Sequence, residues 1–106
     1  MNPGKLRHRI TFLRPEEIEN EIGETVIDMK LFKTVWGSIE PIKGREYLEA
    51  RKIQPEVTYR IIVRYIEDIT PDMMIEFKGR IFNIQSILNI GERNQYMEIY
   101  AVEKVK

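Results

Sequence analysis

The sequence predicts a mainly β protein: a small antiparallel β-barrel of about six strands with one long loop that contains a short helix. Two observations lead to this fold class. First, apolar and polar residues alternate with a period of two along most of the apolar segments, which is typical of half-buried strands. Second, turn-forming residues separate these segments at short intervals, as in small barrels and sandwiches. The 106 residues suit one domain, residues 1–106.

The first two strands are each expected to end at a proline. One is expected at 7–14, before Pro15, and the other at 33–40, before Pro41, because proline cannot donate a hydrogen bond to a neighbouring strand. In the second strand, small and branched residues face opposite to Trp36, which is expected to cover a barrel end or to lie in a subunit contact.

The alternation is clearest in the third strand, 57–65. One face of this strand is apolar or aromatic and is expected to pack in the core, with the tyrosine hydroxyls at the barrel rim; it carries Val57, Tyr59, Ile61, Val63 and Tyr65. Three further strands are expected at 73–77, 80–89 and 95–103, bounded by turns at Thr70-Pro71-Asp72, Lys78-Gly79 and 91–94.

Two segments depart from this pattern. Residues 15–31 are acidic and weakly patterned, and are expected to form a long exposed hairpin connection whose arms can be strands. Residues 41–56 lie between two strands and are expected to be a long loop with a short helix, bounded by Pro41 and Pro55. If half of this loop extends away from the barrel and the other half returns, it could project about 25 Å at roughly 3.3 Å per residue. A neighbouring copy or a nucleic-acid backbone could receive it.

The net charge is zero, because 17 Lys and Arg residues balance 17 Asp and Glu residues. This balance argues against a protein that coats DNA and against a polybasic membrane binder. The charges are nevertheless unevenly distributed. Residues 1–14 carry +4, residues 15–30 carry −5, and residues 43–64 carry +3. The blocks can be complementary docking patches or incidental clusters on a solvated surface.

The residues needed for catalysis are scarce. Cysteine is absent, His8 is the only histidine and is expected at a surface or edge, and no glycine-rich phosphate loop is present. We therefore expect no enzyme activity, no cofactor and no metal site. No apolar run is long enough to span a bilayer, and the first residues lack the apolar core of a secretory signal, so we expect synthesis and use without translocation and without membrane contact.

Three blocks of the sequence resemble a known family, the head-tail joining proteins of long-tailed bacteriophages, also called head completion or stopper proteins. The blocks are 4–15, 35–65 and 69–103, together 78 of 106 residues. They contain, in order, a basic strand near the start, W-x-S-I-E-P, G-R-E-Y, T-x-R-I-x-V-R-Y, I-T-P-x-M, and G-R-x-F-x-I followed by E-R-N. The succession and spacing of these motifs carry the resemblance, which is lost in the acidic 15–31 stretch.

The resemblance implies a structural virion protein, made in the bacterial cytoplasm, in the head-tail connector of a phage or prophage. Copies would form a ring, dodecameric in the virion, although isolated copies can be monomeric. The ring would lie below the portal and adaptor proteins, close or gate the DNA channel, and offer the attachment surface for a tail completion protein. The 41–56 loop would reach the channel and meet phage DNA without sequence specificity, through Lys43, Gly44, Arg45, Glu46, Tyr47, Arg51 and Lys52.

A ring needs two different complementary patches on each copy. The basic start and the acidic hairpin are the candidates, with expected interface residues Arg7, Arg9, Glu16, Glu17, Glu19 and Trp36. The alternative function is a free-standing small-barrel module that binds nucleic acid through the basic loop and the face that carries Arg60 and Arg64.

Overall fold

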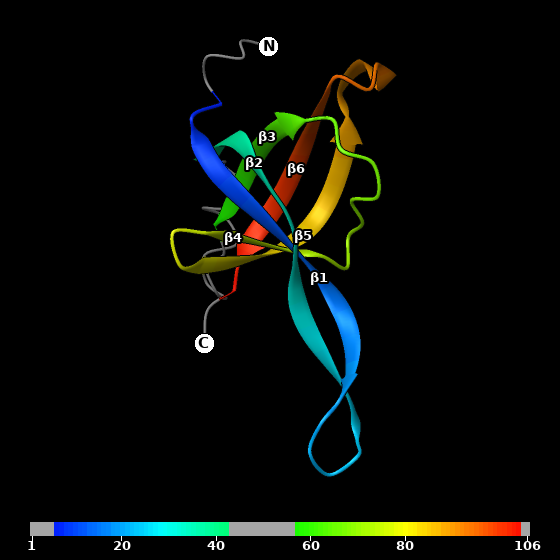
Figure 1. The fold of residues 1–106 in the computed structure, drawn as a ribbon. Helices are drawn as coiled ribbons and strands as arrows, with labels where there is room; N and C mark the ends of the chain where they lie inside the picture. The colour runs from blue at the N-terminus through cyan, green and yellow to red at the C-terminus, as the bar shows by residue number, and fades with distance from the viewer. Residues whose placement is uncertain (1–5, 43–56, 105–106) are drawn as a thin grey trace.

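The computed structural model describes residues 6–42 and 57–104, which form a closed antiparallel barrel (Figure 1). Its six strands are β1 (His8–Glu19), β2 (Thr25–Ile42), β3 (Thr58–Arg64), β4 (Met74–Phe77), β5 (Arg80–Asn89) and β6 (Tyr96–Glu103). Around the barrel the order is β1-β2-β3-β6-β5-β4, and β4 closes onto β1. The predicted barrel is confirmed.

The core consists of the inward-facing residues of alternate strand positions. The fully buried side chains come from every strand of the wall except β2, and the largest are Phe12, Phe82, Ile10, Ile61, Ile75, Ile99 and Val63. Burying one such side chain contributes roughly 1.5–3 kcal/mol. Tyr59 and Tyr65 pack against this cluster as predicted, and the ring of Tyr59 meets that of Phe82 edge-on, with centroids 5.1 Å apart.

The tight turns follow their sequence signals. Lys78 and Gly79 both have positive φ, 53° and 79°, which gives the hairpin turn between β4 and β5. The backbone N–H of Met73 donates to the carbonyl of Thr70 at 3.1 Å, closing the predicted turn there. Between β5 and β6, residues 90–92 form a short 3-10 helix, the only helical segment in the described residues. The helix expected within 41–56 lies outside the described residues, apart from 41 and 42, which belong to β2.

The ends of the first two strands differ from the prediction. The first strand does not end before Pro15: β1 continues to Glu19. The second strand does not end before Pro41: β2 continues to Ile42. Pro15 pairs with Met29 of β2 on one side, and β4 no longer flanks β1 at that point. Pro41 likewise pairs only with Tyr59 of β3. Each proline therefore lies on an edge, the position in a sheet where a residue without an N–H is tolerated.

The long strands β1 and β2 leave the barrel together as a twisted two-stranded hairpin (Figure 1). Residues 15–31 thus form the exposed hairpin connection that was expected, and its arms are strands. A β-bulge interrupts the pairing where the hairpin leaves the wall: Phe12 faces Lys33, whereas Leu13 faces Leu31, so Phe32 is the extra residue. Bulges increase the local twist of a strand pair, and the two arms of the hairpin cross each other near the tip (Figure 1).

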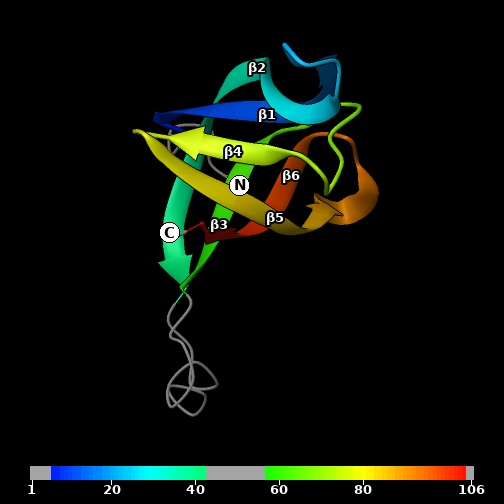
Figure 2. The ribbon, with the colours of Figure 1, turned by 90° about the horizontal axis from the view of Figure 1, so that it is seen from below.

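The barrel has two different ends. The hairpin leaves from the end formed by Leu13 of β1 and Leu31 of β2. At its other end, β2 finishes at Ile42, which is directly paired with Thr58 of β3. β2 therefore runs as one continuous strand from the hairpin tip to Ile42 (Figure 2).

Candidate interaction surfaces

One face of the β1–β2 ladder is continuous from the barrel wall to the hairpin tip. In β1, Ile10 and Phe12 point into the core, so the alternate positions point outward. Residues that face each other across an antiparallel pair share a side of the sheet. The resulting outer face consists of the pairs Arg9–Trp36, Thr11–Thr34, Leu13–Leu31, Pro15–Met29, Glu17–Ile27 and Glu19–Thr25.

Large apolar side chains are exposed along this outer face. Leu31 is 68% exposed, Ile27 61% and Trp36 54%. The opposite face of the same hairpin exposes only Val26 among its large apolar side chains, and that one by 36%. Scattered single apolar residues are normal on protein surfaces, whereas exposed apolar residues gathered on one face make that face a candidate interaction surface.

The charges on the outer face change sign along its length. At the barrel end the guanidinium of Arg9 lies over the ring of Trp36, 4.8 Å from its centroid, a cation–π arrangement. At the tip the outer face carries the carboxylates of Glu17 and Glu19. We call Arg9, Leu13, Leu31 and Trp36 the root patch, and Glu17, Glu19 and Ile27 the tip patch. The root patch is basic and apolar, and the tip patch is acidic and apolar.

The structure divides the predicted interface residues between the two faces. Arg9, Glu17, Glu19 and Trp36 share the outer face, whereas Glu16 lies on the other, paired with Asp28. Asp28 also forms an ion pair with Lys30 at 3.2 Å. Arg7 is exposed and precedes β1. The predicted loop residues Lys43, Gly44, Arg45, Glu46, Tyr47, Arg51 and Lys52 lie outside the described residues.

Sequence reasoning missed Leu13, Ile27 and Leu31. The signal was present, because Ile27, Met29 and Leu31 alternate with charged residues in a segment that we took to be weakly patterned.

A shallow apolar groove of about 440 Å³ lies on the outer wall beside the hairpin root. Leu13, Met29, Met74 and Ile81 form its apolar lining, and Arg80 and Glu103 lie at its polar edge. The groove therefore extends the apolar part of the root patch onto β4 and β5. Methionine side chains can adapt their shape to a partner, which suits a contact surface better than a site that must fix a small ligand.

A polar cluster links β3, β5 and β6 through Tyr59, Arg80 and Glu103. Arg80 Nε donates to Glu103 Oε2 at 3.1 Å, and Arg80 Nη2 donates to Glu103 Oε1 at 2.9 Å and to the Tyr59 hydroxyl at 2.8 Å. These hydrogen bonds from the guanidinium hold the pKa of the Glu103 carboxyl below its usual value, and the pKa of Arg80 is raised. His8 packs edge-on against Phe77 nearby, with ring centroids 5.2 Å apart.

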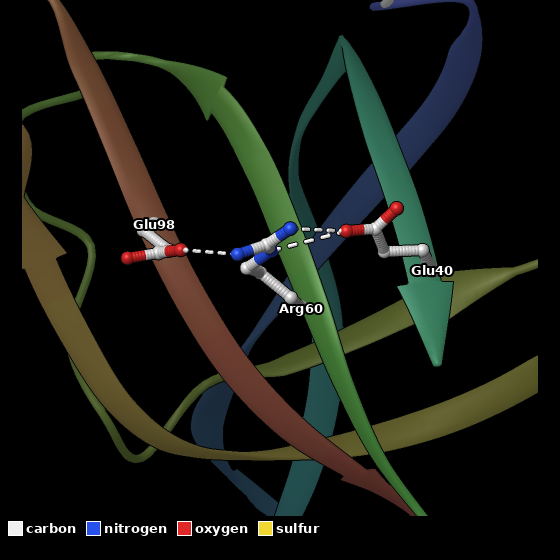
Figure 3. Close-up of polar contacts among 3 residues, drawn as sticks. All are labelled: Glu40, Arg60 and Glu98. Atoms are coloured by element: carbon white, nitrogen blue, oxygen red, sulfur yellow. Dashed lines mark hydrogen bonds and ion pairs between the residues drawn. The ribbon is translucent and has the colours of Figure 1, made fainter. Parts of the chain in front are cut away.

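Arg60, at the centre of the outer β2–β3–β6 wall, is held by two carboxylates (Figure 3). Its Nε donates to Glu40 Oε2 at 3.1 Å, its Nη2 contacts the same oxygen, and its Nη1 lies 3.5 Å from Glu98 Oε2. The hydrogen bond with Glu40 is the main cause that raises the pKa of Arg60. Arg64, on the same face in sequence, lies over the ring of Tyr96. This wall thus contains both charge signs and is not a continuous basic surface.

Residues 6–42 and 57–104 contain no cluster of three or more His, Cys, Asp or Glu residues that could hold a metal ion. Among the same residues, no helix has the length and apolar character required to cross a membrane.

Comparison with known proteins identifies the family. A model of the phage head completion protein family matches residues 1–104. The chain belongs to this family. A phage head completion protein is a structural protein of the phage head and not an enzyme, and the resemblance seen in the sequence is thereby confirmed.

Two solved structures are similar to this head completion protein. The solution structure of protein SF1141 from Shigella flexneri 2a has 25% sequence identity and a TM-score of 0.76, over 100% of this chain and 99% of that one. A chain of the virion of a native gene transfer agent particle has 17% identity and a TM-score of 0.67, over 94% and 96% of the two chains. The second likeness shows a shared fold. No curated protein matches the sequence.

Proposed function

We propose that this head completion protein is a ring subunit of the head-tail connector, located below the portal and adaptor proteins, and that the ring closes or gates the DNA channel and provides the tail attachment surface. The family match over residues 1–104 is the observation that carries the proposal. The partners are copies of the chain itself, the portal or adaptor protein, a tail completion protein and, without sequence specificity, the DNA in the channel.

The arrangement of the barrel supports a division of tasks between its two ends. A closed barrel has no free sheet edge in its wall and can serve as a rigid wedge. The hairpin, with opposite charges at its root and tip, leaves one end and is suited to contacts between subunits. Residues 43–56 follow the other end of β2 in the sequence and include Lys43, Arg45, Arg51 and Lys52, which suit contact with phosphates in a channel.

The alternative, a free nucleic-acid-binding module, receives less support. It requires the Arg60 face to be available to phosphates, but Arg60 is already held by Glu40 and Glu98. It predicts salt-dependent DNA binding by the isolated monomer.

Particles assembled with variant protein test the gating function. Deleting residues 44–52 is expected to give filled heads that lose their DNA, scored by electron microscopy and by nuclease sensitivity of the packaged genome. The matched control replaces Lys43, Arg45, Arg51 and Lys52 by Gln and keeps the segment at full length. Because closure is steric in this proposal, the control heads should stay sealed. Heads that stay sealed after the deletion would refute the gating role.

A further inference from the structure

We propose that the tip patch of one copy docks on the root patch of the next, so that the outer face of the β1–β2 ladder supplies both halves of the contact between subunits. The inference rests on the proposed ring function and identifies the surface that builds it. It also limits the interface to one face of the hairpin: Glu17, Glu19 and Ile27 take part, whereas Glu16 and Asp28 do not.

Charge complementarity identifies a second copy as the partner. The tip patch presents an exposed isoleucine beside two carboxylates, so its partner must offer apolar surface with a positive rim. The root patch has these properties: Leu31 and Trp36 are more than half exposed, and Arg9 lies against Trp36. Aromatic residues and arginine are also the residue types that dominate the energy of protein interfaces.

The apolar content of the two patches gives a reason for them to associate. In the single chain, three apolar side chains on the same ladder face are exposed to water: Ile27, Leu31 and Trp36. Docking tip on root would bury these side chains together, and the adjoining groove lined by Met29 and Met74 can adapt to the incoming tip. Charge pairing at the rim would then fix the register.

The twist of the hairpin permits a heterologous contact. A flat ladder would point both patches in the same direction, and reciprocal docking of two copies would give a closed two-fold pair. Two-stranded ribbons twist strongly, the bulge at Phe12 and Leu13 adds to this twist, and the two arms of the hairpin cross each other near the tip (Figure 1). The same ladder face therefore turns between root and tip, and each copy can meet two different neighbours, as a ring requires.

Crosslinking in assembled particles tests the contact directly. The chain has no cysteine, so the double variant Ile27→Cys with Thr34→Cys carries one thiol in the tip patch, a second on the outer face between Leu31 and Trp36 of the root patch, and no other. Within one copy these positions are seven residues apart on one strand, roughly 23 Å, which is beyond a short bifunctional maleimide. The matched control is Asp28→Cys with Thr34→Cys, whose first thiol lies on the opposite face of the hairpin.

The expected result is a series of covalent oligomers longer than the dimer for the Ile27 variant and mainly monomer for the Asp28 control. Covalent dimers without longer species would mean reciprocal two-fold docking and would overturn the proposal. Sealed heads whose subunits do not crosslink would also overturn the docking proposal, but they would leave the gating function standing. Crosslinked rings in heads that leak DNA would support the docking proposal and refute the gating function.

Affinity between copies provides an independent measurement. In sedimentation of the full-length protein, at concentrations high enough for the wild type to self-associate, Glu17→Gln with Glu19→Gln is expected to weaken self-association about three- to tenfold, and Trp36→Ala at least about tenfold. The control variant Glu16→Gln with Asp28→Asn removes the same charge from the other face and should change the dissociation constant of self-association less than about twofold. Equal effects of the two neutralised pairs would contradict the assignment of the outer face.

Discussion

Gly37 offers a test of how tightly the barrel wall is packed. It lies in β2 where the strand is flanked on both sides, opposite His8 of β1 and Val63 of β3. It faces inward, and a Cβ atom added there would lie 2.7 Å from Val63 Cγ1, 2.8 Å from the carbonyl oxygen of Ile62 and 2.9 Å from Ile10 Cγ1. One of these three neighbours is backbone, so a side-chain rotation alone cannot relieve the contacts.

Gly37→Ala should therefore be strongly destabilising. Overpacking of a buried site costs about 1–3 kcal/mol, and we expect the upper end of that range. For a domain of this size the midpoint temperature should fall by roughly 10–20 °C, measured by circular dichroism during thermal unfolding. The double variant Gly37→Ala with Val63→Ala, compared with Val63→Ala alone, removes the Val63 contact but keeps the backbone contact, so part of the loss should persist. A midpoint within about 2 °C of the wild type would refute the reasoning.

Two further predictions concern ion pairs. Because Arg80 lowers the pKa of Glu103, this carboxylate stabilises the fold above its unfolded pKa, and the contribution is lost as the pH falls through the lowered folded pKa. Glu103→Gln should thus lower the unfolding temperature at neutral pH, and the difference from the wild type should vanish toward about pH 2; a constant difference would contradict this. Arg60→Ala should cost only about 0.2–1 kcal/mol in urea unfolding, since the side chains of Arg60 and of its main partner Glu40 are 41% and 55% exposed, and a loss above about 2 kcal/mol would show that the triad is structural.

Local pattern was sufficient to predict the strands but not their ends. The alternation in β3, β5 and β6 reflects which side chains are buried, so it located these strands in the sequence. The sequence predicts strand ends at Pro15 and Pro41 because a proline breaks a ladder that is paired on both sides. Both lie at edges, and whether a residue is at an edge depends on which other strands are its neighbours, which is tertiary information.

The candidate interface shows the same limit. Charge blocks in the sequence pointed to the basic start and the acidic hairpin, but they could not separate Glu16 from Glu17. That separation depends on the cross-strand register and on the bulge at Phe12 and Leu13. Register in turn depends on which face is buried by the barrel. The long 43–56 segment stays a prediction, because it lies outside the described residues.

The bulge also restricts how the hairpin can vary in length. Outward positions in β1 are odd-numbered throughout, whereas in β2 they are even at Trp36 and odd at Leu31, because the bulge adds one residue between them. An insertion or deletion of one residue between bulge and tip would leave the barrel intact but turn one arm over. In the β2 arm it would bring Asp28 and Lys30 to the outer face in place of Ile27, Met29 and Leu31, and in the β1 arm it would turn Glu17 and Glu19 away from that face. We therefore expect hairpins of different length among related proteins to differ by even numbers in each arm, so that their parity is preserved while the sequence diverges.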